Sequence, residues 1–366
     1  MPVTTAALSR DPRAGFHIEP VVVDDPRAHE ILVRVEAAGI CHTDLVSRAA
    51  GSDERPVLLG HEGAGTVAAV GSEVTGVRPG DRVVLTFRHC GACRNCRLGR
   101  PAYCAQSVRL NQFGARPDRT PRVTAAGKPV RDGFFGQSSL AGYALSTPDN
   151  TVVVPPGTDL AVAAPLGCGF QTGAGAVLNV LRPEPDSTLV IFGAGAVGLA
   201  GLLAALTLPD TRVIVVETAA ARRDTALELG AVAALDPGTV DVSAAIGELT
   251  AGGATHALDT TGRPDVLATA VGVLGVGGAA AAVGLGAGIP PIDVRDLVLS
   301  GKSIHGCLEG DSIPARFIPE LLALHAAGRL PLDRLVRTYP HTDIDRALAD
   351  QRAGHIVKPV LTWATV

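Results

Sequence analysis

Four of the seven cysteines lie close together in the chain, at a spacing that suits a metal ion. Cys90, Cys93, Cys96 and Cys104 follow the pattern Cys-x2-Cys-x2-Cys-x7-Cys. Zinc favours tetrahedral coordination by thiolates, and four protein ligands leave no open position, so this loop predicts a structural zinc site. The short spacings alone leave an iron–sulfur cluster or disulfides as alternatives.

A glycine-rich segment indicates a second kind of site. Gly193, Gly195 and Gly198 form the pattern Gly-x-Gly-x-x-Gly, which follows an apolar run at 187–192 and precedes a helical pattern at 196–207. In this context the glycines let the backbone approach a pyrophosphate at the positive end of the helix. A tight turn without a ligand is the alternative, and the flanking strand and helix argue against it. The segment predicts a dinucleotide site.

An acidic residue indicates which dinucleotide binds. Glu217 directly follows the next apolar run, 212–216. A carboxylate there can accept hydrogen bonds from both ribose hydroxyls and repels a 2′-phosphate, so it favours NAD over NADP. Arg222 and Arg223 follow a few residues later. They are either solvated helix charges or cofactor contacts that would tolerate some NADP.

The elements around these glycines alternate in type. Further apolar strands are expected at 254–258 and 279–283, and a helix is expected at 222–229. Strands and helices in alternation predict a parallel sheet with right-handed crossovers, an α/β Rossmann fold.

The first 165 residues have a different pattern. They are rich in Val, Gly and Pro, with short alternating runs such as 30–35 and turn signals such as 78–81. This is typical of an antiparallel β domain. From Ile304 onward we expect one or two helices and an extended tail at 356–361 that return to this first domain.

Three more candidate ligands, Cys41, His61 and Cys168, stand apart in the sequence. Each alone is a weak signal, because a lone Cys is usually a small buried hydrophobe and a lone His usually has an ordinary hydrogen bond. Their surroundings read Gly-Ile-Cys-His-Thr-Asp, Gly-His-Glu-Gly and Pro-Leu-Gly-Cys-Gly-Phe-Gln-Thr-Gly. With the cysteine loop and the glycine pattern, in this order and at this spacing, the chain resembles the zinc-containing medium-chain alcohol dehydrogenases.

The resemblance implies a fold and a domain division. It implies a β-rich GroES-like catalytic domain formed by 1–169 and 306–366, and a doubly wound Rossmann domain for the cofactor at 170–305. It also implies a homodimer or homotetramer.

The resemblance implies two zinc ions per chain and one NAD. Cys41, His61 and Cys168 match the ligands of the catalytic zinc, whose fourth position stays open for water or the substrate oxygen. A zinc of this kind lowers the pKa of an alcohol that passes a hydride to NAD and becomes an aldehyde. The four-cysteine loop matches the structural zinc site.

Other positions take their roles from the same resemblance. Thr43 matches the hydroxyl that takes the substrate proton, and Asp44 matches the carboxylate that orients the ligand histidine. Glu62 matches a residue that approaches the zinc during ligand exchange. His42 and Lys358 match basic residues at the cofactor pyrophosphate.

Two positions concern the substrate and the proton. Phe87 is expected to line the substrate pocket. Val46 stands where many family members have the histidine that ends the proton relay, so the proton must leave through the cofactor ribose and water, or through another residue.

Several stretches resemble one branch of the family, the bacterial aryl-alcohol (benzyl alcohol) dehydrogenases. These stretches are 41–46, 134–139, 309–313 and 316–319. The valine at position 46 is shared with that branch. The expected substrate is therefore a primary aromatic or allylic alcohol, with terpenoid alcohols such as geraniol as an alternative.

Composition excludes some partners. A formal net charge of −4 gives no electrostatic reason to expect nucleic acid or an anionic membrane. The most apolar tract, 272–291, is interrupted by glycines and ends in prolines, so it is expected to form core strand and loop rather than a membrane span. Residues 1–16 lack the apolar region of a signal peptide, and a cytoplasmic location is expected.

Two other functions are compatible with these motifs. One is a nicotinoprotein, in which NAD stays bound and an external acceptor regenerates it. The other is a non-catalytic protein that binds zinc and a dinucleotide. The complete set of Thr43, Glu62 and three zinc ligands argues against the second, because fold alone does not settle function but a binding protein has no need of an open metal position.

Overall fold

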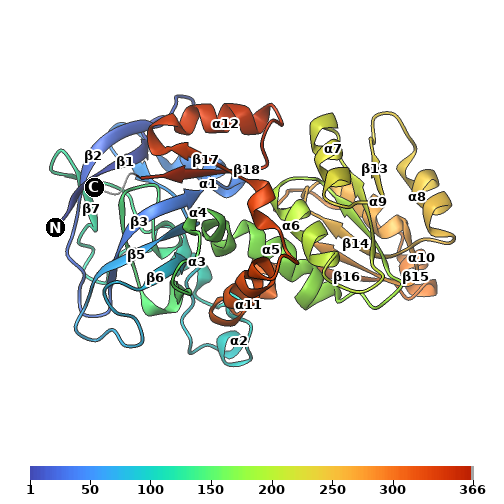
Figure 1. Ribbon diagram of the computed structural model, residues 1–366, viewed down its shortest axis with the longest axis horizontal. Helices are drawn as coiled ribbons and strands as arrows, with labels where there is room; N and C mark the ends of the chain where they lie inside the picture. The colour runs from blue at the N-terminus through green and yellow to red at the C-terminus, as the bar shows by residue number, and fades with distance from the viewer. Residues whose placement is uncertain (364–366) are drawn as a thin grey trace. The chain divides into compact units, whose positions relative to one another are not determined.

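The structure is a computed structural model that describes residues 1–363 (Figure 1). The chain divides into two compact units, both discontinuous in sequence. The first contains 1–168, 313–323 and the chain from 336 onward, and the second contains 169–312 and 324–335. Each unit has its own sheets and is described by itself.

The first unit is rich in β-strands. Its strands are β1 (Val3–Ser9), β2 (His17–Val23), β3 (Ile31–Gly39), β4 (Val57–Leu58), β5 (Gly63–Val70), β6 (Arg82–Leu85), β7 (Val123–Ala125), β8 (Lys128–Pro129), β9 (Tyr143–Ser146), β10 (Thr151–Val153), β17 (Val336–Pro340) and β18 (Lys358–Thr362). One sheet has the order β4-β1-β2-β7-β8, and the other has the order β10-β6-β5-β3-β18-β17, with β9 also paired to β3. All pairs are antiparallel except β17 with β18.

Strand β3 explains how this unit is held together. Because β5, β9 and β18 all pair with it, most of its residues are buried, including Ile31, Val33 and Val35. The pairing of β18 places Val360 opposite Gly39, so the tail of the chain lies beside the segment that leads to the first cysteine motif.

The helices of the first unit are short. They are α1 (His42–Ser47), α2 (Arg94–Arg97), α3 (Ser107–Asn111), α4 (Leu160–Ala163) and α12 (Ile344–Arg352), with α11 (Pro314–Ala326) contributing its residues up to 323. Several functional residues lie at helix ends or in turns rather than inside helices. We therefore expect backbone hydrogen bonds to position them.

The second unit contains one parallel sheet. Its strands are β11 (Thr188–Phe192), β12 (Arg212–Val216), β13 (Ala233–Leu235), β14 (Ala254–Asp259), β15 (Leu274–Ala282) and β16 (Ser303–Gly306). The order β13-β12-β11-β14-β15-β16 makes the first strand along the chain a central one, with later strands added on both sides. This is the doubly wound Rossmann arrangement that the alternating pattern predicted.

Helix α5 (Gly169–Gly175) precedes the first of these strands. The helices that connect the strands are α6 (Ala196–Ala205), α7 (Ala220–Glu228), α8 (Val242–Thr250), α9 (Pro264–Gly272) and α10 (Val294–Leu299). The helix expected at 196–207 is α6, and the one expected at 222–229 is α7. The apolar tract at 272–291 contains β15 and a loop.

The expected domain boundary at 306 differs from the observed one. Residues 306–312 belong to the second unit, where Asn179 Nδ2 donates to the Gly310 carbonyl at 2.9 Å and Ser312 Oγ donates to Gln171 Oε1 at 3.0 Å. The segment 324–335 also belongs there. These contacts join residues more than 100 positions apart, which the local pattern did not reveal.

Among the described residues no single helix is both long and apolar enough to cross a membrane. Within residues 1–363, the bent pair Leu160–Gly167 and Gly169–Leu181 meets the length and composition criteria for a span when the two helices are taken together.

Candidate zinc and dinucleotide sites

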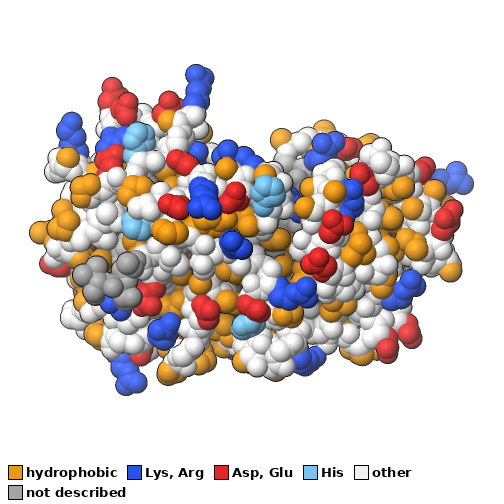
Figure 2. Space-filling model, turned by 45° about the horizontal axis from the view of Figure 1, so that its top comes forward, with side chains coloured by type: hydrophobic (Ala, Val, Ile, Leu, Met, Phe, Trp, Pro, Cys, Tyr) orange, Lys and Arg blue, Asp and Glu red, His pale blue; other side chains and the backbone are white. Residues whose placement is uncertain are grey.

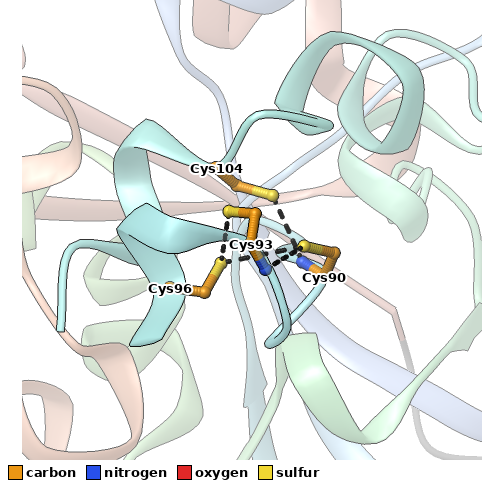
Figure 3. A group of neighbouring side chains, drawn as sticks. All are labelled: Cys90, Cys93, Cys96 and Cys104. Atoms are coloured by element: carbon orange, nitrogen blue, oxygen red, sulfur yellow. Dashed lines mark hydrogen bonds between the residues drawn. The ribbon is translucent and has the colours of Figure 1, made fainter. Parts of the chain in front are cut away.

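The four-cysteine loop converges on one point (Figure 3). The sulfur atoms of Cys90, Cys93, Cys96 and Cys104 all lie within 4.8 Å of one another, and Figure 3 shows them pointing toward a common centre. All seven cysteines, each within the described part of the chain, are free thiols rather than disulfides. The loop thus has the donor set and compactness of a tetrahedral zinc site.

Backbone N–H groups surround these sulfurs. Cys93 N donates to Cys90 Sγ and Cys90 N donates to Cys104 Sγ, both at 3.3 Å. The N–H groups of Cys96 and Ala105 lower the pKa of the Cys93 thiol to about 6, whereas burial raises the pKa of Cys96 to about 12. Cys93 is therefore ready to act as a thiolate ligand near neutral pH.

A second group of candidate ligands lies within the first unit. The ligand atoms of Cys41, His61, Glu62 and Cys168 also lie within 4.8 Å of one another. Cys41 directly precedes α1, and His61 and Glu62 precede β5. Cys168 follows the 3-10 helix η5 (Ala164–Gly167). Three separate chain segments thus contribute to one cluster.

Asp44 organises this cluster from the first turn of α1. Its Oδ1 lies 2.9 Å from His61 Nδ1 and accepts from Gly60 N, while its Oδ2 accepts from Cys41 N at 2.9 Å. Both Asp44 and His61 are fully buried. A carboxylate bonded to one ring nitrogen fixes the orientation of the imidazole and leaves the other nitrogen for a metal.

The other ring nitrogen supplies a test of that interpretation. Among residues 1–363, His61 Nε2 has no hydrogen-bond partner although it is buried. A buried polar atom of this kind requires an explanation, and a metal ion held also by Cys41 and Cys168 provides one. The residues present therefore fit a zinc ion with three protein ligands.

Neighbouring groups shift the pKa values of Cys41 and His61. Hydrogen bonding to Cys168 and the neighbouring His61 ring lower the pKa of the Cys41 thiol well below its usual value. Burial opposes a charge on His61, but Asp44 and Cys41 raise the pKa of its ring well above the usual value. The lowered pKa of Cys41 favours the thiolate, which is the form that binds a divalent metal.

Glu62 is paired with Lys358. Lys358 Nζ is 2.7 Å from Glu62 Oε1 and 2.6 Å from Oε2, and it also donates to the Ile40 carbonyl at 3.0 Å. Lys358 is only 1% exposed. Sequence reasoning gave it a role at the cofactor pyrophosphate and did not detect the ion pair, whose partners are 296 positions apart. The pyrophosphate role stays a prediction.

Two aromatic rings enclose the ligand histidine. The Phe135 ring is stacked on the His61 ring with centroids 4.5 Å apart, and Phe134 meets it edge-on at 5.4 Å. Phe135 has a left-handed backbone, with φ at 50°. In the sequence, the stretch 134–139 indicates only a resemblance to the aryl-alcohol branch. No local pattern in it predicts the contact with the histidine.

The remaining predicted residues of the first unit have less defined surroundings. Thr43 Oγ1 lies 3.9 Å from Cys41 Sγ, and Phe87 is buried. His42 is exposed, and Val46 is 63% exposed. The roles of these four residues toward proton, substrate and cofactor stay predictions.

The glycine loop has the geometry of a phosphate cradle. Gly193 has φ at 95°, and a Cβ there would lie 2.5 Å from Thr260 Oγ1. A Cβ on Gly198 would lie 1.9 Å from the Gly193 carbonyl oxygen, so helix α6 packs too closely for a side chain. A Cβ on Gly195, directly before α6, would meet nothing within 4 Å, which leaves space for a pyrophosphate at the helix N-terminus.

Glu217 lies in a cleft beside this loop. The cleft has a volume of about 720 Å³ and is lined by residues that include Gly193, Glu217, Asp241 and Arg263. Glu217 Oε2 accepts from Ala194 N at 2.7 Å, so the carboxylate is held next to the glycine loop. These features fit the adenosine half of a dinucleotide.

Of the two nearby arginines, Arg223 is already engaged. Its guanidinium donates to the Glu217 carbonyl at 2.8 Å and pairs with Asp236 at 3.0 Å. Arg222 is not among the residues that line the cleft. The predicted contact of Arg222 with the cofactor stays a prediction.

A Rossmann sheet with a glycine cradle and a β-rich unit with two thiolate clusters define the class of zinc-binding dehydrogenases. The family model described as "Alcohol dehydrogenase GroES-like domain" matches residues 27–156, and the one described as "Zinc-binding dehydrogenase" matches 196–326.

Comparison with individual proteins shows which members of this class the chain is similar to. The chain is 46% identical over 362 residues to a geraniol dehydrogenase of Castellaniella defragrans, covering 98% of this chain and 97% of that protein. An alcohol dehydrogenase zinc-binding domain protein from Burkholderia ambifaria superposes with a TM-score of 0.95 at 45% identity, covering all of both chains. Benzyl alcohol dehydrogenase from Acinetobacter calcoaceticus superposes with a TM-score of 0.93 at 40% identity, again over both whole chains.

The chain therefore belongs to the zinc-containing medium-chain alcohol dehydrogenase family. It is an NAD-dependent enzyme that acts on alcohols and aldehydes. The fold and the family predicted from the sequence are confirmed.

Proposed function

We propose that this enzyme oxidises primary aromatic or allylic alcohols to aldehydes with NAD, at a zinc ion held by Cys41, His61 and Cys168. The observation that carries the site assignment is the buried His61 Nε2, which has no hydrogen-bond partner within residues 1–363 and lies among two thiols. A zinc ion bound there supplies a Lewis acid that lowers the pKa of the alcohol.

The chain's own residues perform the other tasks. Asp44 holds the His61 ring in one orientation and one tautomer. Thr43, whose hydroxyl lies near Cys41 Sγ, takes the proton of the substrate hydroxyl. Lys358 neutralises the buried Glu62 carboxylate, which limits the negative charge beside two thiolates.

The second zinc and NAD have separate places. Cys90, Cys93, Cys96 and Cys104 hold a zinc without an open position, and its role is structural. Gly195 and the start of α6 bind the pyrophosphate, and Glu217 binds the adenosine ribose.

The substrate class rests on two supports. The relatives named above act on geraniol, an allylic alcohol, and on benzyl alcohol. The side chains around the ligand histidine are also aromatic, with Phe134 and Phe135 against its ring. A flat conjugated alcohol buries about 100 Å² more apolar surface than ethanol, which corresponds to about 2.5 kcal/mol of binding.

An activity screen tests this proposal. The rate of NADH formation is measured with benzyl, cinnamyl, geranyl, aliphatic and sugar alcohols, and zinc is quantified in the same preparation. We expect kcat/KM for benzyl or geranyl alcohol to exceed that for ethanol by about 70-fold or more, the ratio that 2.5 kcal/mol gives. Equal efficiency with ethanol would refute the substrate class.

Two variants separate the two zinc roles. His61→Ala is expected to abolish activity and lose one zinc while leaving the fold largely intact. Cys93→Ser is expected to lose the other zinc together with much of the stability, because the loop has few other contacts to order it. A total of one zinc per wild-type chain, or iron with sulfide, would contradict the assignment.

The proposal includes a homo-oligomer and a cytoplasmic location. Strand β16 forms an edge of the six-stranded sheet, and exposed apolar side chains occur in the segments that flank it. Zinc-binding thiols must stay reduced, which suits a cytoplasmic environment. Acidic and basic side chains are interspersed on the face shown in Figure 2, which is consistent with a small-molecule substrate as the main partner.

A further inference from the structure

The side chain of Gln137 lies between two segments of the proposed catalytic zinc site. It follows the 3-10 helix η3 (Phe134–Gly136) and is 3% exposed. Its Nε2 donates to the His61 carbonyl at 3.0 Å, and its Oε1 accepts from Gly63 N at 3.1 Å. The amide thus binds the backbone on both sides of Glu62, including the carbonyl of a zinc ligand.

The same amide reaches a third segment. Gln137 Nε2 also donates to the Thr86 carbonyl at 3.1 Å, directly after β6. Thr86 in turn donates from Oγ1 to the Gly167 carbonyl at 2.7 Å, one residue before Cys168. A continuous hydrogen-bonded path therefore runs from His61 through Gln137 and Thr86 to the residue next to Cys168.

Two glycines let these segments come close enough for the path. A Cβ on Gly63 would lie 2.5 Å from Ser139 Cβ and 3.1 Å from Gln137 Oε1. A Cβ on Gly167 would lie 2.2 Å from the Leu85 carbonyl oxygen. Because neither glycine has a positive φ, close packing rather than backbone conformation requires the missing side chain at both positions.

We infer that Gln137 and Thr86 are positioning residues that fix the distance between the zinc ligands His61 and Cys168. This inference rests on the proposed catalytic zinc site. Asp44 sets the orientation of the His61 ring, but its bonds lead to Cys41 and Gly60 and do not reach Cys168. The Gln137–Thr86 path joins the backbone of the histidine segment to the backbone of the Cys168 segment. Without it, the ligands would hold a metal with a less defined geometry.

Three variants test the inference. Gln137→Met keeps the length of the side chain and removes its hydrogen bonds. Thr86→Val removes the hydroxyl at nearly constant shape, and Thr86→Ser retains it. Asn111→Leu is the control, because Asn111 is also a buried amide and its hydrogen bonds go to the Arg88 backbone at 2.7 and 3.0 Å and to Ser107 rather than to His61, Gly63 or Thr86.

The measurements report on the metal as well as on turnover. Cobalt(II) is placed in the catalytic site, and its thiolate charge-transfer and ligand-field absorption bands are recorded. Zinc release to a chelator, the melting temperature, kcat and the KM for NAD are measured in parallel. In Gln137→Met and Thr86→Val we expect shifted cobalt bands, at least tenfold faster zinc release and at least tenfold lower kcat, with the KM for NAD within twofold of wild type.

Thr86→Ser is expected to match wild type, and Asn111→Leu is expected to lower the melting temperature without changing the cobalt bands. If Gln137→Met does not fold, the comparison of Thr86→Val with Thr86→Ser decides the question. If wild type holds two zinc ions but Gln137→Met and Thr86→Val keep its cobalt bands and its rate of zinc release, the inference is overturned and the proposed zinc site stands. A wild type without zinc at Cys41, His61 and Cys168 would overturn the proposed site as well.

Discussion

The contacts of Glu217 explain how a single carboxylate can select the cofactor. Its Oε2 accepts from Ala194 N, and its Oε1 accepts from Ala219 N at 2.9 Å, so the charge is fixed at the edge of the nucleotide cleft. Asp241 and Asp265 line the same cleft. The fixed Glu217 carboxylate repels the 2′-phosphate of NADP, a group that NAD lacks.

We predict that Glu217→Ser lowers the ratio of kcat/KM for NAD to that for NADP at least tenfold, or about 1.4 kcal/mol. Asp236 holds Arg223 at 3.0 Å, so Asp236→Asn should free a guanidinium for the phosphate. The double variant should therefore shift the ratio further than Glu217→Ser alone. Steady-state kinetics with both cofactors measure these ratios, and an unchanged ratio in both variants would show that another residue contacts the ribose.

Thr43 is predicted to carry the proton of the substrate. Thr43→Val removes the hydroxyl at constant shape and should lower kcat for alcohol oxidation by roughly 10²- to 10⁴-fold, whereas Thr43→Ser should stay near wild type.

Val46 is 63% exposed, so Val46→His adds a titratable group without a packing cost. We expect its rate to stay within a few-fold of wild type and to rise at low pH. Full activity in Thr43→Val would exclude the relay.

At the residue scale, local spacing in the sequence accounts for the contacts within one segment. The cysteine loop closes within 15 residues, and Asp44 reaches Cys41 N within one helical turn. The contacts of Lys358 with Glu62 and of Gln137 with His61 depend instead on strand pairing and on turns that bring distant segments together. No periodicity in a single segment encodes those contacts.

Among the elements, the cysteine loop depends on an anchor outside itself. Asp149 Oδ2 accepts from the Arg88 guanidinium at 3.0 Å and from His89 N at 3.1 Å, directly before Cys90. Burial works against ionisation of Asp149, but the hydrogen bonds with Arg88 outweigh it and hold the pKa of the carboxyl below its usual value. The charge of Asp149 therefore stabilises the start of the loop.

The pH dependence of this anchor follows from the direction of the pKa shift. In the unfolded chain the pKa of Asp is about 3.9, so the ion pair stabilises the fold above that pH and loses its effect as the pH falls through the lower folded-state value. Asp149→Asn should lower the free energy of unfolding at pH 7 by about 1.5–3 kcal/mol. Denaturant unfolding at several pH values should show this difference shrinking below about pH 4. A difference independent of pH would mean that the charge of Asp149 is not involved.

Element types were predicted more reliably than pairing. Strand β12 was predicted at its observed bounds, because four apolar residues in a row form a fully buried parallel strand. The expected antiparallel domain contains one parallel pair, β17 with β18. Helix α12 lies between these strands in the chain and returns it to the same end, a crossover that the tail sequence did not reveal.

At the scale of the whole molecule, two sequence patterns distinguish the two units: short β runs with turns, and strands alternating with helices. These patterns do not locate the boundaries of the units. The alternation of strands and helices predicted the doubly wound sheet, and its first strand β11 carries the glycine loop as expected. The segments 306–312 and 324–335 could not be assigned from pattern, because both are short and their tertiary contacts decide which unit they join.

The second unit has an unpaired sheet edge and exposed apolar residues. Strand β16 pairs only with β15 within the described chain, so its outer backbone groups are available to another strand. Val276 is 88% exposed, Leu285 84% and Ile289 90%, and on α10 Val298 and Leu299 are 71% and 73% exposed. These exposed apolar residues belong to β15, to the loop after it and to α10, which precede β16 in the chain. Exposed apolar residues and a free strand edge are both typical of a protein interface.

A second copy of the same chain is the partner that satisfies such an edge symmetrically. Two β16 strands can pair antiparallel about a twofold axis, and the apolar residues of each copy then cover those of the other. We predict a homodimer or a tetramer built from such dimers. In sedimentation equilibrium at micromolar concentration, Val298→Glu with Leu299→Glu should yield monomers, since each buried charge opposes association. Val108→Glu, at a 69% exposed valine of the other unit, should keep the wild-type mass. A wild-type monomer, or dissociation by Val108→Glu as well, would rule out this interface.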